Sequence, residues 1–224
     1  MNPINAASLL SELVDEVTEE GLTLSIESDP EALYATGKDL PDKNLSKLFD
    51  PGYVDLVPDR FFWIRANSHN GDTVHVQACK LDDTGRSTLG DFLNMHLNRT
   101  YPSTQRQWHR CEALETIGGR CAYQGDNWLA ESYRGNGVGT TLTQIGLLSC
   151  FLKWQPDFVY AFFEHPVFSK GLGCKFGYQH FEPVGQHFKK WLLPHDYVSW
   201  MSWKHMVTLI EMSAPRTGLE DLQR

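Results

Sequence analysis

No stretch of this 224-residue sequence approaches the roughly 20 consecutive apolar residues that a membrane-spanning helix requires, so we expect no membrane segment. Residues 1–20 contain acidic side chains and no basic start before an apolar core, so we predict that they are not a signal peptide. Basic residues are few: 20 Lys and Arg stand against 28 Asp and Glu, a net charge of −8. This balance argues against nucleic-acid binding, which needs a basic surface.

Cysteine is present but forms no recognisable pattern. Five cysteines are scattered along the chain, which favours a reduced, cytoplasmic setting over a disulfide framework. His109, Cys111 and Cys121 include no C-x-x-C pair, so we expect no metal site. Cys174 lies in a glycine-rich segment without a Cys/His/Asn pattern, and we interpret it as a packing or exposed thiol.

Hydrophobic periodicity predicts a mixed α/β chain. Its first part indicates helices interspersed with strands, and Asn70-Gly71 between two alternating runs is a strong hairpin signal. The region 101–124 shows no clear pattern. The elements expected before it are a helix from Pro3 to Gly21, a strand at 22–26, short helical pieces at 31–36 and 45–49, strands at 60–67 and 73–81 with an end at 82–85, and a helix at 88–98.

The second part of the chain has a β-α-β pattern. A strand at 127–133 leads into a glycine-rich loop, a helix at 137–154 follows, and a continuous apolar run at 158–163 indicates a buried strand. A short helix at 166–175 and strands at 177–183 and 197–204 complete the prediction. The aromatics Trp191, Tyr197, Trp200 and Trp203 line an acceptor pocket, form core, or form the interface of a homodimer.

The most informative segment is the glycine-rich run from Tyr133 to Thr141. Three glycines at alternate positions, Gly135, Gly137 and Gly139, follow Arg134. A backbone with so few side chains can curl closely around an anion. The helix after it offers unpaired N–H groups and a dipole that favours negative charge. We therefore interpret the run as a pyrophosphate cradle.

Three known phosphate-binding patterns differ in their spacing. A P-loop requires G-x-x-x-x-G-K-[ST], and no lysine occupies the required position here. A dinucleotide-binding fingerprint requires G-x-G-x-x-G at the start of a parallel βα array, whereas this run has G-x-G-x-G after an antiparallel section. The run from Arg134 to Gly139 does match R-x-x-G-x-G.

That motif resembles motif A of the GNAT superfamily of acyl-CoA-dependent N-acyltransferases. The resemblance covers residues 126–182: Trp128–Arg134 is similar to the family's fourth strand with its bulged end, Phe158–Phe163 to the fifth strand, and Lys175–Tyr178 to the step into the sixth. It implies an α/β (α+β) fold with a mixed, mostly antiparallel sheet of about seven strands, flanked by helices and splayed at strands 4 and 5. We expect one domain at 1–212, with an insertion at about 85–125, and a flexible tail at 213–224.

The resemblance also implies a cofactor and its binding residues. Coenzyme A, as acetyl-CoA or another acyl-CoA, would be the co-substrate, with its pyrophosphate on the backbone N–H groups of Arg134 to Gly139. Its pantetheine would run into the splay, and a backbone N–H near Leu129 would polarise the thioester carbonyl. The predicted binding residues are Trp128, Leu129, Ala130, Arg134, Gly135, Asn136, Gly137, Val138, Gly139 and Thr140.

The implied reaction is direct attack of an amine on the thioester through a tetrahedral intermediate, and an ammonium must first lose a proton. The candidates for this base are Glu164 with His165, after the buried strand, and Glu131, at the end of the strand before the loop. Each also fits a solvated strand-end side chain. The family often has a tyrosine as the acid for the thiolate, four residues before Gly177, but Gly173 stands there.

The sequence therefore predicts an N-acyltransferase whose acceptor is a small-molecule or peptide amine. Two alternatives stay open: a non-catalytic, CoA-binding module of the same fold, and an acyltransferase that uses acyl carrier protein or longer acyl chains.

Overall fold

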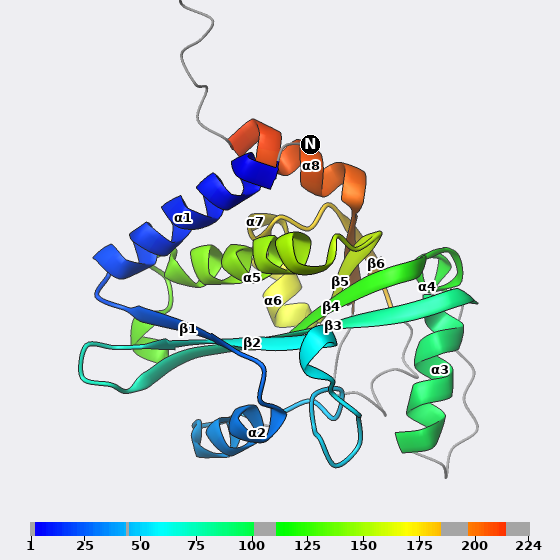
Figure 1. Cartoon of the computed structure of the whole chain (residues 1–224), viewed down its shortest axis with the longest axis horizontal. Coiled ribbons are helices and arrows are strands. Elements are labelled where there is room, and N and C mark those ends of the chain that lie inside the picture. The colour runs from blue at the N-terminus through cyan, green and yellow to red at the C-terminus, as the bar shows by residue number, and fades with distance from the viewer. Residues whose placement is uncertain (1–2, 44, 101–110, 185–196, 214–224) are drawn as a thin grey trace, which may run out of the picture.

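The computed structural model describes residues 3–43, 45–100, 111–184 and 197–213 (Figure 1). The strands among them are β1 (Thr23–Glu27), β2 (Phe61–Asn67), β3 (Thr73–Thr88), β4 (Gly118–Leu129), β5 (Phe158–Phe163), β6 (His180–Pro183) and β7 (Tyr197–Ser202). They form a seven-stranded sheet in the order β1-β2-β3-β4-β5-β7-β6. β4 and β5 are parallel and the other neighbours are antiparallel. The predicted mixed, mostly antiparallel sheet is confirmed.

Helices cover both faces of this sheet (Figure 1). α1, α5 and α8 lie over one face and enclose one cluster of buried side chains, while α2, α3 and α4 contribute to a second cluster on the other face. The helices in the described part of the chain are α1 (Pro3–Glu19), α2 (Pro30–Asp39), α3 (Leu89–Thr100), α4 (Glu112–Thr116), α5 (Val138–Trp154), α6 (His165–Ser169), α7 (Leu172–Phe176) and α8 (Trp203–Ser213), with short 3-10 turns η1 (Pro58–Arg60) and η2 (Glu131–Tyr133). Each of these helices is too short or too polar to cross a bilayer.

The helix pattern of the sequence is largely confirmed. In α1 the apolar stripe buries Leu13 and Val17, and Gly21, at φ +78°, turns the chain into β1. α5 is buried on most of its surface because α1 packs over it and the sheet lies beneath. The short helix predicted at 166–175 is two helices, α6 and α7, because Gly171 adopts φ +67° between them.

The central feature of the sheet is the early parting of β4 from β5. The two strands pair only from Cys121–Phe158 to Tyr123–Tyr160. β4 then stays paired with β3 as far as Leu129, while β5 stays paired with β7 as far as Phe163. The predicted splay between strands 4 and 5 is therefore present, and each of its edges is held by the strand on its other side.

The predicted end of β3 at 82–85 is wrong. The strand continues to Thr88 because Gly85, at φ +60°, lies within an irregularity of the ladder that does not end it. Thr84 bridges this point: its hydroxyl donates to the Ser87 carbonyl at 2.8 Å and accepts the Gly119 N–H at 2.8 Å.

The predicted strand at 127–133 is also misplaced, because β4 begins at Gly118 and ends at Leu129. The N–H of Ala130 still donates to the Val74 carbonyl at 2.8 Å. The chain then closes into η2, where the Tyr133 N–H donates to the Ala130 carbonyl at 3.0 Å. The glycine run therefore follows a tight turn and not a strand.

Two smaller predictions are wrong as well. Residues 45–49 form a turn, in which the Phe49 N–H donates to the Ser46 carbonyl at 2.9 Å, and not a helix. The last predicted strand stops at Ser202, and α8 begins at Trp203, whose ring stacks on Phe151 of α5 at 4.4 Å. Trp191 and residues 214–224 of the predicted tail lie outside the described residues.

The connection from β3 to β4 spans residues 89–117 and contains α3 and α4. Strand residues thus occupy both ends of the predicted insertion at 85–125. The Glu182 carboxylate of β6 accepts the N–H groups of Glu112 and Ala113 at 2.7 and 2.8 Å. This carboxylate caps α4 and fixes the end of the connection to the sheet.

A buried polar network joins α5 to the sheet just beyond the last β4–β5 pair. The Tyr178 hydroxyl donates to Gln124 Oε1 at 2.8 Å, and Gln124 Nε2 donates to Gln77 Oε1 and to the Thr143 carbonyl, both at 2.9 Å. Gln77 Nε2 donates to the Leu142 carbonyl. Buried amides left unpaired would cost free energy, so the network fixes α5 on the two strands.

Gly146 lets α5 approach these amides, and its replacement tests the contact. A Cβ at Gly146 would lie 2.5 Å from Gln77 Oε1 and 2.6 Å from Gln124 Nε2. We expect Gly146→Ala to lower the free energy of unfolding by about 1–3 kcal/mol through overpacking, although Ala is the better helix former. Urea unfolding would measure this, with Thr140→Ala on the same helix as control. An unchanged or raised midpoint would contradict the prediction.

Candidate functional site

The glycine run forms an open loop at the N-terminus of α5. Gly135 and Gly137 adopt φ values of +92° and +99°, which other residues rarely adopt. A Cβ at either position would meet no atom of the described residues within 4 Å, so these residues leave the space above the loop open. Asn136 shapes the turn, because its Oδ1 accepts the Val138 N–H at 3.2 Å.

The loop presents unpaired backbone donors. The N–H of Arg134 is bonded to the Glu131 carbonyl, and that of Thr140 to the Gly137 carbonyl. Among the described residues, four N–H groups of the loop have no protein acceptor. These belong to Gly135, Asn136, Gly137 and Gly139. Unpaired donors at the positive end of a 17-residue helix make a site for an anion.

Gly139 has a different role from the other two glycines. A Cβ at this position would lie 2.9 Å from Leu129 Cδ2, so the first turn of α5 rests on the end of β4. A larger residue would require the Leu129 side chain or the loop to shift. The third glycine therefore joins the cradle to the splay.

Arg134 folds back over the same strand end. Its Nε donates to the Leu129 carbonyl at 2.9 Å, and the side chain is otherwise exposed. The guanidinium carries positive charge beside the loop in an acidic protein, where it would attract an anion.

The N–H of Leu129 points into the splay. Leu129 is opposite His75 in the antiparallel ladder. Because the next N–H, that of Ala130, donates to the Val74 carbonyl, Leu129 and His75 are a non-hydrogen-bonded pair. The Leu129 N–H and carbonyl thus face the side from which β5 has parted. Of the three predicted residues at this strand end, Ala130 has its N–H engaged, and the Trp128 indole donates to the Pro41 carbonyl at 3.2 Å.

The three predicted catalytic residues lie at one edge of the sheet, because the carboxyl ends of parallel strands meet there. Glu164 follows β5, is half-buried and occupies the N-cap position of α6 without a capping bond from its side chain, and His165 is the exposed first residue of that helix. Glu131 follows β4 and is exposed. Glu164 and His165 therefore lie on the β5 side of the splay, and Glu131 lies on the β4 side.

A tyrosine at the position of Gly173 would not fit. This glycine is buried in α7, and a Cβ there would clash with the Phe181 ring. Tyr178, the nearby alternative, is fully buried in the amide network, and burial raises the pKa of its phenol well above the usual value.

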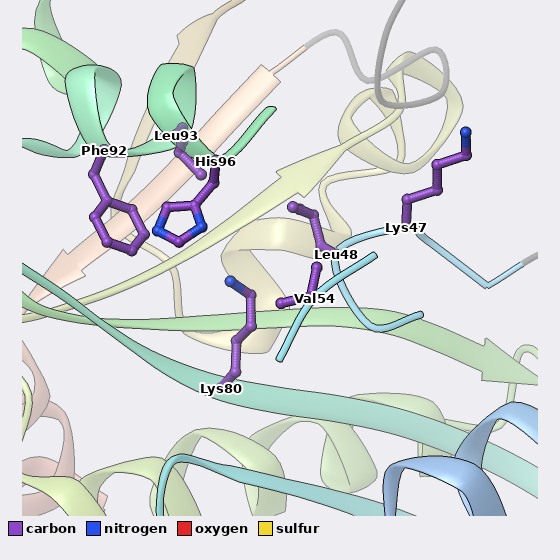
Figure 2. A pocket seen from close by; sticks show the side chains of 7 residues that line it. All are labelled: Lys47, Leu48, Val54, Lys80, Phe92, Leu93 and His96. Atoms are coloured by element: carbon purple, nitrogen blue, oxygen red, sulfur yellow. The ribbon is translucent and has the colours of Figure 1, made fainter. Parts of the chain in front are cut away.

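A small pocket on the sheet face opposite α5 lies away from this edge. Its lining comes from α3, from residues 47–54 and from Lys80 of β3 (Figure 2). Its volume is about 10 Å³, room for one water molecule. The Lys80 ammonium is already bonded to both carboxylate oxygens of Asp82, at 2.7 and 2.9 Å. No group of three metal-ligating side chains occurs among the described residues.

Sequence reasoning missed His75. This side chain is fully buried on β3 between Leu129 and Ala66, and within the described part of the chain neither ring nitrogen has a partner within hydrogen-bonding geometry. Burial lowers its pKa to about 3. The alternation of β3 provides a signal, because His75 and Gln77 are polar residues on the strand face that also buries Cys79.

Comparison with known proteins finds no matching family model and no matching curated sequence. Among solved structures, Arabidopsis thaliana Naa50 with the bisubstrate analogue CoA-Ac-MVNAL is 18% identical, with a TM-score of 0.48 over 81% of this chain and 99% of its own. The NatC complex bound to Gag peptide and CoA is 13% identical, with a TM-score of 0.47 over 81% of this chain and 98% of its own. A spermidine N-acetyltransferase SpeG chimera from Vibrio cholerae and hSSAT is 13% identical, with a TM-score of 0.46 over 84% of this chain and 99% of its own.

These likenesses have TM-scores below 0.5 and carry no information about activity. The fold is instead defined by the sheet itself. Among the described residues, the mixed strand order, the parallel β4–β5 pair and the splay beside the glycine cradle agree with the fold that the sequence motif implies.

His75 makes stability depend on pH. In the unfolded chain its pKa would be near 6.5, so the unfolded state binds a proton between about pH 6.5 and 3 that the folded state does not. Stability therefore falls as the pH falls through this window, by about 2 kcal/mol between pH 6.5 and 5 from this residue.

Urea unfolding at pH 7.5, 6 and 5 would measure this effect. We expect His75→Leu to flatten the slope, and His69→Leu, in the exposed hairpin turn, to leave it unchanged. Equal slopes for the wild type and His75→Leu would contradict the assignment.

Proposed function

We propose that the protein is an acyl-CoA-dependent N-acyltransferase of the GNAT type, with acetyl-CoA or a related acyl-CoA as co-substrate. The observation that carries the proposal is the junction of an anion cradle with an open sheet. The unpaired donors of residues 135–139 lie beside the end of β4, where β4 has already parted from β5.

Each part of this junction fits one part of coenzyme A. The free N–H groups of the loop and the Arg134 guanidinium would bind the pyrophosphate. Amide groups of pantetheine would bond to the splayed strand edges like an added strand. The Leu129 N–H, directed into the splay, would stabilise negative charge on the thioester oxygen.

The acyl-CoA supplies the reactive thioester that an amine attacks. The half-buried Glu164 carboxylate, with His165 beside it, would take the proton that the acceptor ammonium loses. Glu131, on the other side of the splay, is the second candidate for this base. The acceptor is a small-molecule or peptide amine. We expect the enzyme to be cytoplasmic and to require no metal, nucleic acid or membrane.

A non-catalytic CoA-binding module remains the alternative, and one observation favours it. The position at which the family often carries its acid tyrosine is Gly173, and a larger side chain there would meet the Phe181 ring where it now lies. In that case the cradle would bind coenzyme A without turnover.

Gly137 tests the cradle. We expect Gly137→Asp to weaken CoA binding by about tenfold or more, because it adds backbone strain at φ +99° and a negative charge where the pyrophosphate would lie. Calorimetric titration with CoA would measure the affinity. Gly85→Asp is the matched control, because it has φ +60°, equally open space among the described residues and a position near the end of β3 opposite to the pairing with Leu129. Unchanged affinity in Gly137→Asp would overturn the proposal.

Glu164 and His165 test the chemistry. Release of free CoA thiol from acetyl-CoA with a panel of amines would establish turnover, whereas thermal stabilisation by acetyl-CoA without thiol release would favour the binding module. We expect Glu164→Gln or His165→Ala to reduce kcat by about 10²-fold or more while the KM for acetyl-CoA stays similar. If both variants keep the full rate, Glu131→Gln becomes the next test of the base.

A further inference from the structure

β4 contains a bulge at the height of the splay. Val76 pairs with Trp128 and Ala78 pairs with Gly125, so Asp126 and Asn127 together oppose a single residue of β3. Asp126 adopts φ +52°, in the left-handed region. Glycine commonly occupies this position of such a bulge, because other residues are strained there.

The carboxylate of Asp126 makes hydrogen bonds and an ion pair that a glycine at this position could not make. Both of its oxygens accept the Ser46 N–H at 3.0 Å, and Oδ1 also accepts from Lys43 Nζ at 2.9 Å. The Asp126 side chain is only 3% exposed and the Lys43 side chain 12%. A buried ion pair of this kind is costly to break by removing one partner, because the other charge is left without compensation.

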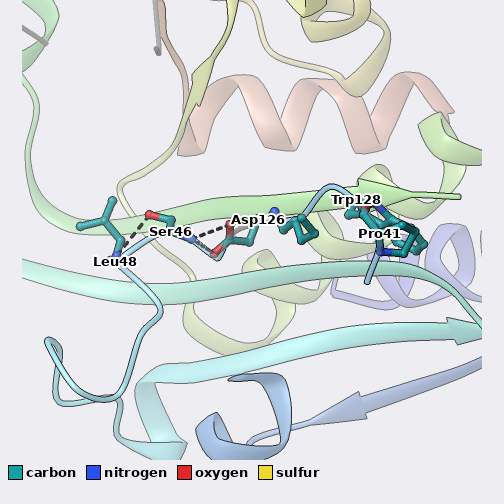
Figure 3. A network of polar contacts seen from close by, with 6 residues as sticks. Pro41, Ser46, Leu48, Asp126 and Trp128 are labelled. Carbon is teal, nitrogen blue, oxygen red and sulfur yellow. Dashed lines mark hydrogen bonds and ion pairs between the residues drawn. The ribbon is translucent and has the colours of Figure 1, made fainter. Parts of the chain in front are cut away.

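These contacts fix one loop along β4. Residues 40–43 and 45–49, here called the post-α2 loop, lie on the sheet face opposite α5 (Figure 3). The Pro41 carbonyl accepts from the Trp128 indole at 3.2 Å, and Phe49 stacks on Tyr123 at 5.3 Å. Asp126 binds the loop between these two contacts. The loop therefore spans β4 from the start of the splay to the residue next to Leu129.

We propose that Asp126 is a positioning residue that couples the post-α2 loop to the β4 bulge, so that the loop and the Leu129 N–H are held as one unit. The inference rests on the proposed function. The bulge rotates the last residues of β4 relative to β3, and the Leu129 N–H lies three residues beyond Asp126. Movement of the loop would therefore displace the donor from the thioester oxygen. The free N–H groups of Gly135 and Gly137 lie further along the chain than the contact of Gly139 with Leu129, so they would move less.

The test separates backbone strain from the side-chain contact. Asp126→Gly relieves the strain and removes the contact, whereas Asp126→Asn retains an oxygen for the Ser46 N–H and removes the ion pair. Asp42→Gly is the matched control, because Asp42 also adopts a left-handed conformation, at φ +54°, in the same loop but is exposed. For each protein, calorimetry with CoA, the kcat and KM for acetyl-CoA, and amide hydrogen exchange of residues 45–49 with and without acetyl-CoA would be measured.

We expect Asp126→Gly to bind CoA with an affinity within about twofold of the wild type, to lose about tenfold or more in kcat, and to exchange the amides of residues 45–49 about tenfold faster. Asp126→Asn should fall between it and the wild type, and Asp42→Gly should match the wild type. This pattern differs from general destabilisation, which would weaken CoA binding as well.

Two results would overturn the inference. If the wild type turns over and Asp126→Gly keeps both kcat and the exchange rate of residues 45–49, Asp126 does not couple the loop to the site. If Asp126→Gly does not fold, wild-type kcat and exchange in Asp126→Ala, which removes the same side-chain contacts, would lead to the same conclusion. A wild type that does not bind acetyl-CoA would instead overturn the proposed function, and this inference with it.

Discussion

The whole candidate site depends on the parting of β4 from β5 after three residue pairs. An exposed sheet edge leaves backbone N–H and C=O groups without partners, and buried groups of this kind are costly. Here each strand is held on its other side, β4 by β3 and β5 by β7, so the gap can persist without loss of the sheet. The Arg134 side chain donates a hydrogen bond to the Leu129 carbonyl. The Leu129 N–H, which faces the splay, would be paired by the amide groups of the proposed pantetheine.

Side chains fill both faces of the sheet just beyond the last β4–β5 pair, and they fix where the splay begins. On the α5 side, the Tyr178 hydroxyl and the amides of Gln124 and Gln77 form a continuous chain of hydrogen bonds that ends at the Leu142 carbonyl. On the other side, the rings of Tyr123 and Tyr160 lie 5.0 Å apart, and the Phe49 ring stacks on Tyr123. These side chains leave little room for the strands to part earlier or later, because a close-packed interior resists deformation.

The parts of this site that the sequence predicts are the local ones. The glycine loop and α5 are specified by neighbouring residues: positive φ at Gly135 and Gly137 requires glycine, and the apolar pattern of α5 continues to Pro156. The bulge at Asp126 has no such local signature, because its contact with Ser46 joins residues 80 positions apart. The start of β4 and the burial of His75 likewise depend on pairing with distant strands, which hydrophobic periodicity alone does not specify.

The two halves of the proposed function differ in the same way. Binding of a pyrophosphate uses backbone N–H donors, so the spacing of a few glycines in the sequence is enough to predict it. Proton transfer uses side chains that converge from separate elements, and here Gly173 and Phe181 exclude the family's tyrosine, while the raised pKa and the hydrogen bond of Tyr178 hold its proton in the interior. In the proposed reaction, the leaving thiolate would therefore take its proton from water or from the strand ends that carry Glu164, His165 and Glu131. The acid and the base would both lie at the solvent-facing end of the splay.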